Sequence, residues 1–289
     1  MILKKRYRRV GMVLKKFPIA LQLYSVRDFL ARDFEGTLTK VAEMGYDGVE
    51  FAGLYGKSAE EILAITKKLG LKVISAHVPL ADMQADAEGV FALYKSLGCE
   101  YVAVPYLPEA GRPGVGDFEG TIALVASLAQ KAKDAGLTLL YHNHDFEFVK
   151  VENGNYGLDE LYARVPADLL ETELDTCWVN VAGVEPAAYL KKYSGRAPVV
   201  HLKDFVMPGK KPAKLYALIG IDEDEEQKEE EAFSFRPVGY GAQDVEKLLA
   251  AAEEAGSKWL VVEQDSPCMG LDSMECAAKS RAYLKSIGC

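Results

Sequence analysis

The chain of 289 residues is 49% hydrophobic and 27% charged, which is the composition of an ordinary globular protein. It holds no apolar run near the roughly 18 residues that a membrane-spanning helix needs, so we expect no membrane partner. The formal net charge of −9 disfavours nucleic acid as a partner, because an acidic surface repels the phosphate backbone.

Neither the N-terminal segment nor the cysteines indicate export. Residues 1–16 hold seven basic side chains and no acidic one, but they lack the apolar core of about 7–15 residues that a secretory signal needs. We interpret residues 1–17 as a basic N-terminal extension that precedes one domain at 18–289. The five cysteines are odd in number and show no CxxC spacing, which favours a reduced, cytoplasmic compartment.

Short runs rich in β-branched and aromatic residues alternate with amphipathic stretches along the whole chain. The runs predict strands at 19–24, 48–51, 72–78, 101–106, 138–144, 169–176, 199–205 and 259–265. The stretches predict helices at 34–44, 59–69, 85–97, 118–135, 158–164, 186–193, 243–255 and 272–287. Eight strand–helix units favour an α/β fold of the closed (β/α)8 type, a TIM barrel in a single domain. No GxGxxG follows the first strand, so a dinucleotide-binding open sheet has little support.

One segment, 206–235, interrupts this alternation. It begins with prolines and lysines and ends in an acidic run, where residues 222–231 hold eight acidic side chains and one lysine. We interpret it as a long loop after the seventh strand. Because the loops after barrel strands border the active site, part of this segment could act as a lid.

Polar residues gather at the predicted carboxyl ends of the strands, where such barrels build their active sites. All four histidines lie at or near these ends. The full set is Gln22, Tyr24, Glu50, His77, Tyr106, His142, Asn143, His144, Glu147, Glu173, Asp175, His201, Lys203, Asp204, Glu263 and Asp265. Buried charges are costly unless they are paired or bound to metal, so this convergence predicts a cation among them.

The last four strands supply the best ligand set. The sixth, seventh and eighth offer Asp175, His201 and Glu263, and the fifth offers Glu147 or His142. One imidazole with carboxylates suits one divalent metal ion, Mn²⁺, Mg²⁺, Co²⁺ or Zn²⁺. Glu173 shares a strand face with Asp175 but lies one layer deeper, so we interpret it as a core or supporting residue.

These residues resemble the sugar phosphate isomerase/epimerase superfamily, the xylose isomerase-like TIM barrels, from about Pro18 to Ile287. The motifs that carry the resemblance lie at 21–28 (LQLYSVRD), 45–50 (GYDGVE), 141–148 (YHNHDFEF), 173–176 (ELDT), 200–204 (VHLKD), 237–241 (PVGYG) and 262–265 (VEQD). The resemblance implies one divalent metal held by Asp175, His201, Glu263 and a residue of the fifth strand. The HNHDFE run is similar to a subgroup that acts on 3-keto sugars and glycosides, which implies Glu147 as the metal ligand and a histidine of the run as a base.

The expected chemistry is removal of a proton next to a carbonyl, with a metal-stabilised enediolate, in a small-molecule sugar or sugar derivative. We expect a sugar isomerase or epimerase, with a 3-keto sugar or glycoside dehydratase or lyase as the alternative on the same site. The candidate catalytic residues are Glu263, His144, His142 and Lys203. The candidate substrate-binding residues are Gln22, Tyr24, Glu50, His77 and Asn143.

Two hypotheses of other classes remain. A non-catalytic sugar-binding barrel would keep the fold and bind no metal. An endonuclease relative would need three metals, more histidine ligands and a less acidic surface. The sequence is also compatible with a homo-oligomer, and it leaves the sugar and the metal unidentified.

Overall fold

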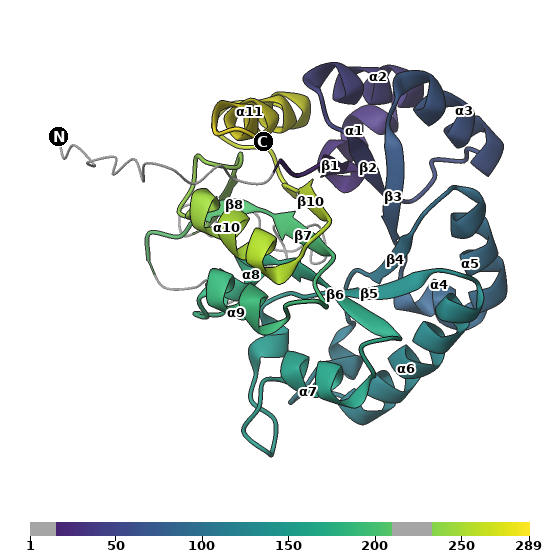
Figure 1. Ribbon diagram of the computed structural model, residues 1–289, viewed down its shortest axis with the longest axis vertical. Coiled ribbons are helices and arrows are strands. Elements are labelled where there is room, and N and C mark those ends of the chain that lie inside the picture. Colours follow the sequence, from purple (N-terminus) through teal and green to yellow (C-terminus); the bar gives the residue numbers. More distant parts are fainter. Residues whose placement is uncertain (1–15, 210–232) are drawn as a thin grey trace.

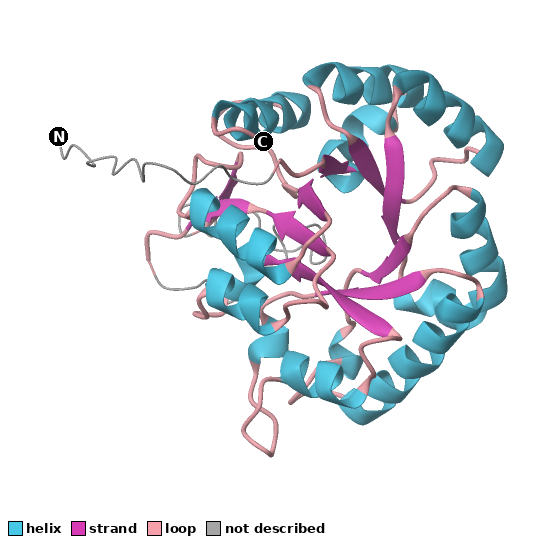
Figure 2. Cartoon of the chain, viewed as in Figure 1, coloured by secondary structure: helices cyan, strands magenta, loops and turns pink. Residues whose placement is uncertain are grey.

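The computed structural model describes residues 16–209 and 233–289, and its centre is a closed barrel of parallel strands inside a ring of helices (Figures 1 and 2). Strand β10 pairs with both β7 and β1, which closes the barrel. The barrel strands are β1 (Ile19–Gln22), β2 (Gly48–Ala52), β3 (Lys72–His77), β4 (Tyr101–Val104), β5 (Thr138–His142), β6 (Leu170–Asp175), β7 (Val199–Leu202) and β10 (Trp259–Val262). The predicted single-domain (β/α)8 barrel is confirmed.

The main helices also follow the predicted alternation. They are α2 (Phe34–Met44), α3 (Ala59–Leu69), α5 (Ala87–Ser96), α6 (Phe118–Asp134), α7 (Gly157–Arg164), α9 (Pro186–Lys192), α10 (Val245–Ala255) and α11 (Ser273–Ser286). Side-chain caps determine where many of them begin, because a capping oxygen accepts an otherwise unpaired backbone N–H. Ser58, for example, caps α3 by accepting from the Glu61 amide, and Asp272 caps α11 by accepting from the Glu275 amide. None of the described helices is both long and apolar enough to cross a membrane.

Several short elements were not predicted, since they span too few residues to show a period. They are α1 (Arg27–Leu30), α4 (Leu80–Ala85), α8 (Thr176–Val181) and the 3-10 turns η1 (Leu23–Val26), η2 (Glu109–Gly111) and η3 (Phe146–Phe148). The predicted helix at 85–97 is corrected: α4 ends at Ala85, and the Asp86 side chain caps α5 by accepting from the Gly89 amide. The predicted strand at 169–176 stops at Asp175, because this side chain caps α8.

A small antiparallel sheet of β8 (Asp204–Val206) and β9 (Ser234–Arg236) follows the barrel strand β7 (Figure 1). The predicted long loop at 206–235 therefore begins and ends in strands. The acidic run and most of the suggested lid lie outside the described residues, as do residues 1–15 of the predicted extension. Phe205 and Phe235 of this sheet pack with Trp178 of α8 in a separate apolar cluster.

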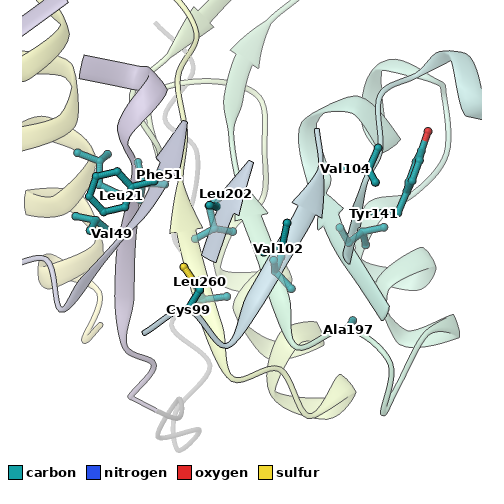
Figure 3. Packing of buried hydrophobic residues seen from close by; sticks show 14 of the residues in the cluster. Leu21, Val49, Phe51, Cys99, Val102, Val104, Tyr141, Ala197, Leu202 and Leu260 are labelled. Atoms are coloured by element: carbon teal, nitrogen blue, oxygen red, sulfur yellow. The ribbon is translucent and has the colours of Figure 1, made fainter. Parts of the chain in front are cut away.

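Each barrel strand has an outer apolar face and an inner face, and the two faces pack differently. Outward residues such as Leu21, Val49 and Phe51 pack against the helices (Figure 3). Inward residues form a compact plug of Ala20, Ile74, Tyr101, Ala103, Leu140, Val199, Trp259 and Val261. Because side chains alternate along a strand, several inward rows continue two residues later in polar side chains, as from Leu140 to His142 and from Val199 to His201. The polar site therefore lies directly above the apolar plug.

Candidate active site

The carboxyl ends of β5, β6, β7 and β10 bring four side chains together, and we call them the outer cluster. They are His142, Asp175, His201 and Glu263, and one ligand atom from each lies within 4.8 Å of the others. His201 Nδ1 lies 3.0 Å from Glu263 Oε2, and His142 Nε2 lies 3.8 Å from Asp175 Oδ2. All four side chains are buried. The expected convergence of Asp175, His201 and Glu263 is thus present in the structure.

Below the outer cluster lies an inner layer made of Gln22, Glu50, His77 and Glu173. His77 Nε2 lies 2.6 Å from Glu173 Oε2, and Gln22 Nε2 donates to Glu50 Oε1 over 2.7 Å. The layer contacts the outer cluster through His201, whose Nε2 lies 2.9 Å from Glu50 Oε1. Gln22 and Glu50, expected to bind substrate, are fully buried here and do not border the cavity described below.

The predicted fifth-strand ligands differ in position. His142 lies in the outer cluster, whereas both Glu147 oxygens are bound elsewhere: Oε1 accepts from the Tyr141 hydroxyl over 2.7 Å and Oε2 from the His144 amide over 2.8 Å. The chain turns through η3 after the strand, which carries Glu147 back towards Tyr141. Burial raises the pKa of Glu147 to about 7 despite these donors. Asn143, expected to bind substrate, accepts from the Asp175 amide and so contacts the end of β6.

Lys203 brings a buried ammonium into the site. Its ammonium lies 2.9 Å from Asp265 Oδ2, 3.0 Å from Glu263 Oε2 and 3.6 Å from Asp175 Oδ2, and its side chain is buried. Burial alone would lower the pKa of Lys203, but Asp265, Glu263 and Asp175 outweigh it and raise that pKa well above its usual value. Lys203 is therefore an ammonium at neutral pH.

A cavity of about 460 Å³ opens onto this site from the barrel mouth. Its lining includes the expected Tyr24, His77, His142, His144, Lys203 and Glu263, together with Ala52, Gly53, Pro79, Asp82, Tyr94, Pro105, Tyr106 and Asp265. Asp82 and Tyr94 were not among the candidate residues, because they lie on α4 and α5 rather than at strand ends. Recognition of a separate short helix that begins at residue 80, directly after the third strand, could have placed Asp82 near the barrel mouth.

His144 has a different environment from the other histidines of the cavity. Its ring stacks on Trp178 and Phe146, with centroids 5.3 and 5.5 Å away, and meets the edge of Tyr106. Burial among these rings lowers the pKa of His144 well below its usual value, and nearby His142 and Lys203 lower it further. His144 is therefore a neutral imidazole that borders the cavity and belongs to neither ligand group of the structure.

The outer cluster fits a divalent cation. Asp175 Oδ2 is buried and has no hydrogen-bond donor among the described residues, although buried acceptors normally have one. Separations of 3.0–3.8 Å between ligand atoms suit ligands about 2.0–2.2 Å from a common ion. Asp175, Glu263 and Asp265 with Lys203 carry a net charge of −2 when the carboxylates are ionised, which a divalent ion would neutralise.

The fold is a TIM barrel of an enzyme family, and its buried imidazoles and carboxylates form a group that could hold a metal ion. The chain belongs to the xylose isomerase-like TIM barrel family, whose sequence profile matches residues 38–287. The predicted membership of the sugar phosphate isomerase/epimerase group is confirmed, and the family implies a small sugar-derived substrate.

Known relatives resemble the chain over most of its length. An inosose dehydratase of Clostridium beijerinckii is 24% identical over 279 residues, covering 87% of this chain and 89% of that protein. A sugar phosphate isomerase/epimerase from Parabacteroides distasonis ATCC 8503 has a TM-score of 0.76 at 20% identity, covering 96% and 97% of the two chains. The structure of IOLI protein with a binding zinc atom has a TM-score of 0.69 at 16% identity, covering 94% and 98%. At these identities the solved structures support the fold alone.

Proposed function

We propose that this protein is a divalent-metal-dependent dehydratase that removes water from a neutral, sugar-like ketone. The observation that carries the proposal is a neutral base, His144, and a permanent cation, Lys203, that border one cavity beside the outer cluster. The name of the curated relative, inosose dehydratase, supports the same reaction type. Considered alone, the sequence ranks isomerisation or epimerisation first and dehydration second, whereas the geometry and the relatives support dehydration as the first choice.

The outer cluster, His142, Asp175, His201 and Glu263, would hold the metal ion, which when bound supplies Lewis-acid stabilisation of negative charge on a substrate oxygen. His144 takes the proton from the carbon next to the carbonyl, because it is neutral and outside the ligand set. The Lys203 ammonium stabilises the enolate oxygen that forms. His144 then returns its proton to the departing hydroxyl, so that the hydrogen and the hydroxyl leave together as water.

His144 is the one cavity histidine of the described residues outside the two candidate ligand groups, and one such base favours elimination over epimerisation. Epimerisation needs a second group that returns a proton to the opposite face of the same carbon. Among the other cavity histidines, His77 is bound to Glu173 and His142 belongs to the outer cluster. Dehydration needs one imidazole only, provided that the proton and the leaving hydroxyl lie on the same side.

The cavity also favours an unphosphorylated substrate. Lys203 is the one cationic side chain among its described lining residues, and three carboxylates already surround that ammonium. A phosphate group would meet no uncommitted cation there. Tyr24, Tyr94 and Tyr106 border the cavity and offer faces for the apolar side of a sugar or cyclitol ring.

Epimerisation is the second candidate, because Glu263 borders the same cavity and could exchange a proton with the substrate in concert with His144.

One experiment separates dehydration from epimerisation. The zinc- or manganese-loaded protein is incubated in heavy water with 2-keto cyclitols and 3-keto sugars. Dehydration predicts a product lighter by one water, with enone absorbance. Epimerisation predicts deuterium at carbon with no loss of water. Metal-dependent turnover of neither kind, with substrate binding retained, would favour the non-catalytic sugar-binding barrel.

A further inference from the structure

Two members of the outer cluster, His142 and His201, also contact carboxylates of the inner layer. His201 presents Nδ1 to Glu263, 3.0 Å away, and Nε2 to Glu50, 2.9 Å away. His142 presents Nε2 to Asp175, 3.8 Å away, and Nδ1 to Glu173, 3.3 Å away. Each ring thus has one nitrogen towards the outer cluster and the other towards the inner layer.

A neutral imidazole has one N–H and one lone pair, so it cannot bind a cation through both nitrogens. If the outer nitrogens bind the metal, the inner nitrogens carry the protons and need acceptors. A carboxylate behind a metal-binding histidine commonly serves this purpose, and it holds both the tautomer and the orientation of the ring.

Glu50 is the best-placed acceptor of the inner layer. His77 Nε2 lies closer to Glu173 Oε2, at 2.6 Å, than to Glu50 Oε1, at 3.2 Å, whereas Glu173 Oε2 lies 3.5 Å from His201 Nε2. Glu50 Oε1 lies 2.9 Å from His201 Nε2 in hydrogen-bonding geometry. The pair is fully buried, so water does not compete for the contact.

Gln22 fixes the orientation of Glu50. The Gln22 side-chain oxygen accepts from the Tyr24 amide over 2.9 Å, and this assigns its NH₂ group to Glu50 Oε1, 2.7 Å away. The backbone of η1, which follows β1, therefore orients Gln22, Gln22 orients Glu50, and Glu50 faces His201. This chain of contacts joins the first two strands to the seventh.

We propose that Glu50 is a positioning residue for the metal site, which holds His201 with its Nε2 proton inward and its Nδ1 lone pair towards the outer cluster. The inference rests on the proposed metal-dependent function. It gives the buried carboxylate of the GYDGVE segment a purpose other than the substrate contact that the sequence predicts.

The test is the zinc affinity of the full-length, metal-stripped protein, measured by calorimetry for wild type, Glu50→Gln and Glu171→Gln. Glu171 lies on the same inward row of β6 as Glu173 but one layer lower, so its amide is a matched control. We expect zinc affinity about 10–100-fold weaker in Glu50→Gln and unchanged in Glu171→Gln. Circular dichroism and the thermal midpoint of the metal-free proteins show whether each variant folds.

A second measurement does not depend on any variant. Long-range proton–nitrogen NMR of the zinc-loaded wild type is expected to show the His201 proton on Nε2. Zinc affinity of a folded Glu50→Gln equal to that of wild type, or a His201 proton on Nδ1, overturns the positioning role while leaving the metal-dependent function in place. A wild-type protein that binds no zinc, manganese, cobalt or magnesium overturns the proposed function itself.

Discussion

At the scale of single residues, the site shows how neighbours determine the effect of burial. Burial by itself would lower the pKa of both Lys203 and His144, because it disfavours a positive charge. Three carboxylates surround the Lys203 ammonium and reverse the effect, whereas His144 lies among the rings of Trp178, Phe146 and Tyr106. The same cavity therefore presents a permanent cation and a neutral base, which proton abstraction next to a carbonyl requires.

His144→Phe tests the base directly. A phenyl ring keeps the stacking on Trp178 and Phe146 but cannot take a proton, so we expect turnover to fall about 10²–10⁴-fold with zinc affinity unchanged. Steady-state kinetics and calorimetry measure the two quantities. Retained turnover in a folded variant would remove His144 from the mechanism.

Lys203→Met tests the cation. Removal of the ammonium leaves three buried carboxylates, those of Asp265, Glu263 and Asp175, without their shared positive partner. We therefore expect the free energy of unfolding of the metal-free variant to be about 3–5 kcal/mol lower than that of the wild type. Added zinc should restore part of this loss, since it neutralises the same carboxylates. Urea unfolding with and without zinc measures both effects. A variant as stable as wild type without metal would show that these carboxylates are not ionised together.

At the scale of elements, strand ends decide which site residues can be predicted from sequence. Two-residue alternation places Asp175 correctly because β6 runs to that residue. It cannot place Glu147, since β5 ends at His142 and the chain turns through η3 before this residue. Gln22 is the last residue of β1, yet its side chain donates to Glu50 of the inner layer and does not border the cavity.

Helices α7 and α9 offer an element-scale test through pH. Burial would raise the pKa of Asp159, but Lys192, Tyr193 and Tyr189 bind it and lower that pKa below its usual value. A lowered folded-state pKa contributes stability that is present above the unfolded pKa, about 3.9, and is lost as pH falls through the folded value. We expect Asp159→Asn to unfold more easily than wild type at pH 6 and to approach wild type as the pH falls below about 4. Urea midpoints across this range measure the effect, and a difference independent of pH would contradict it.

At the scale of the whole molecule, the fold follows from local patterns and the inner layer does not. Hydrophobic periodicity and the capped helix starts recur along the chain, so eight strand–helix units can be recognised without knowing which strands touch. The contact between Glu50 and His201 joins residues 151 positions apart. It depends on closure of the barrel and on the register of β2 and β7 around it, neither of which leaves a local signal. Chemistry at strand ends is therefore easier to predict than the buried contacts beneath it.

Metal binding should act on the stability of the whole barrel, because four strands meet at the outer cluster. A ligand that binds only the folded state stabilises it by about 2.7 kcal/mol at 100 times its dissociation constant. We expect chelation to lower the thermal midpoint and zinc to restore it.

Asp175→Asn is the sharpest variant for this test. In the wild type, Asp175 Oδ1 caps α8 by accepting from the amides of Cys177 and Trp178, and the Asn oxygen can keep this cap. The variant loses the charge at Oδ2, so it should fold, lose the zinc-dependent shift and lose turnover. Scanning calorimetry with and without zinc measures the shift, and a zinc response equal to that of wild type would place the cation away from Asp175.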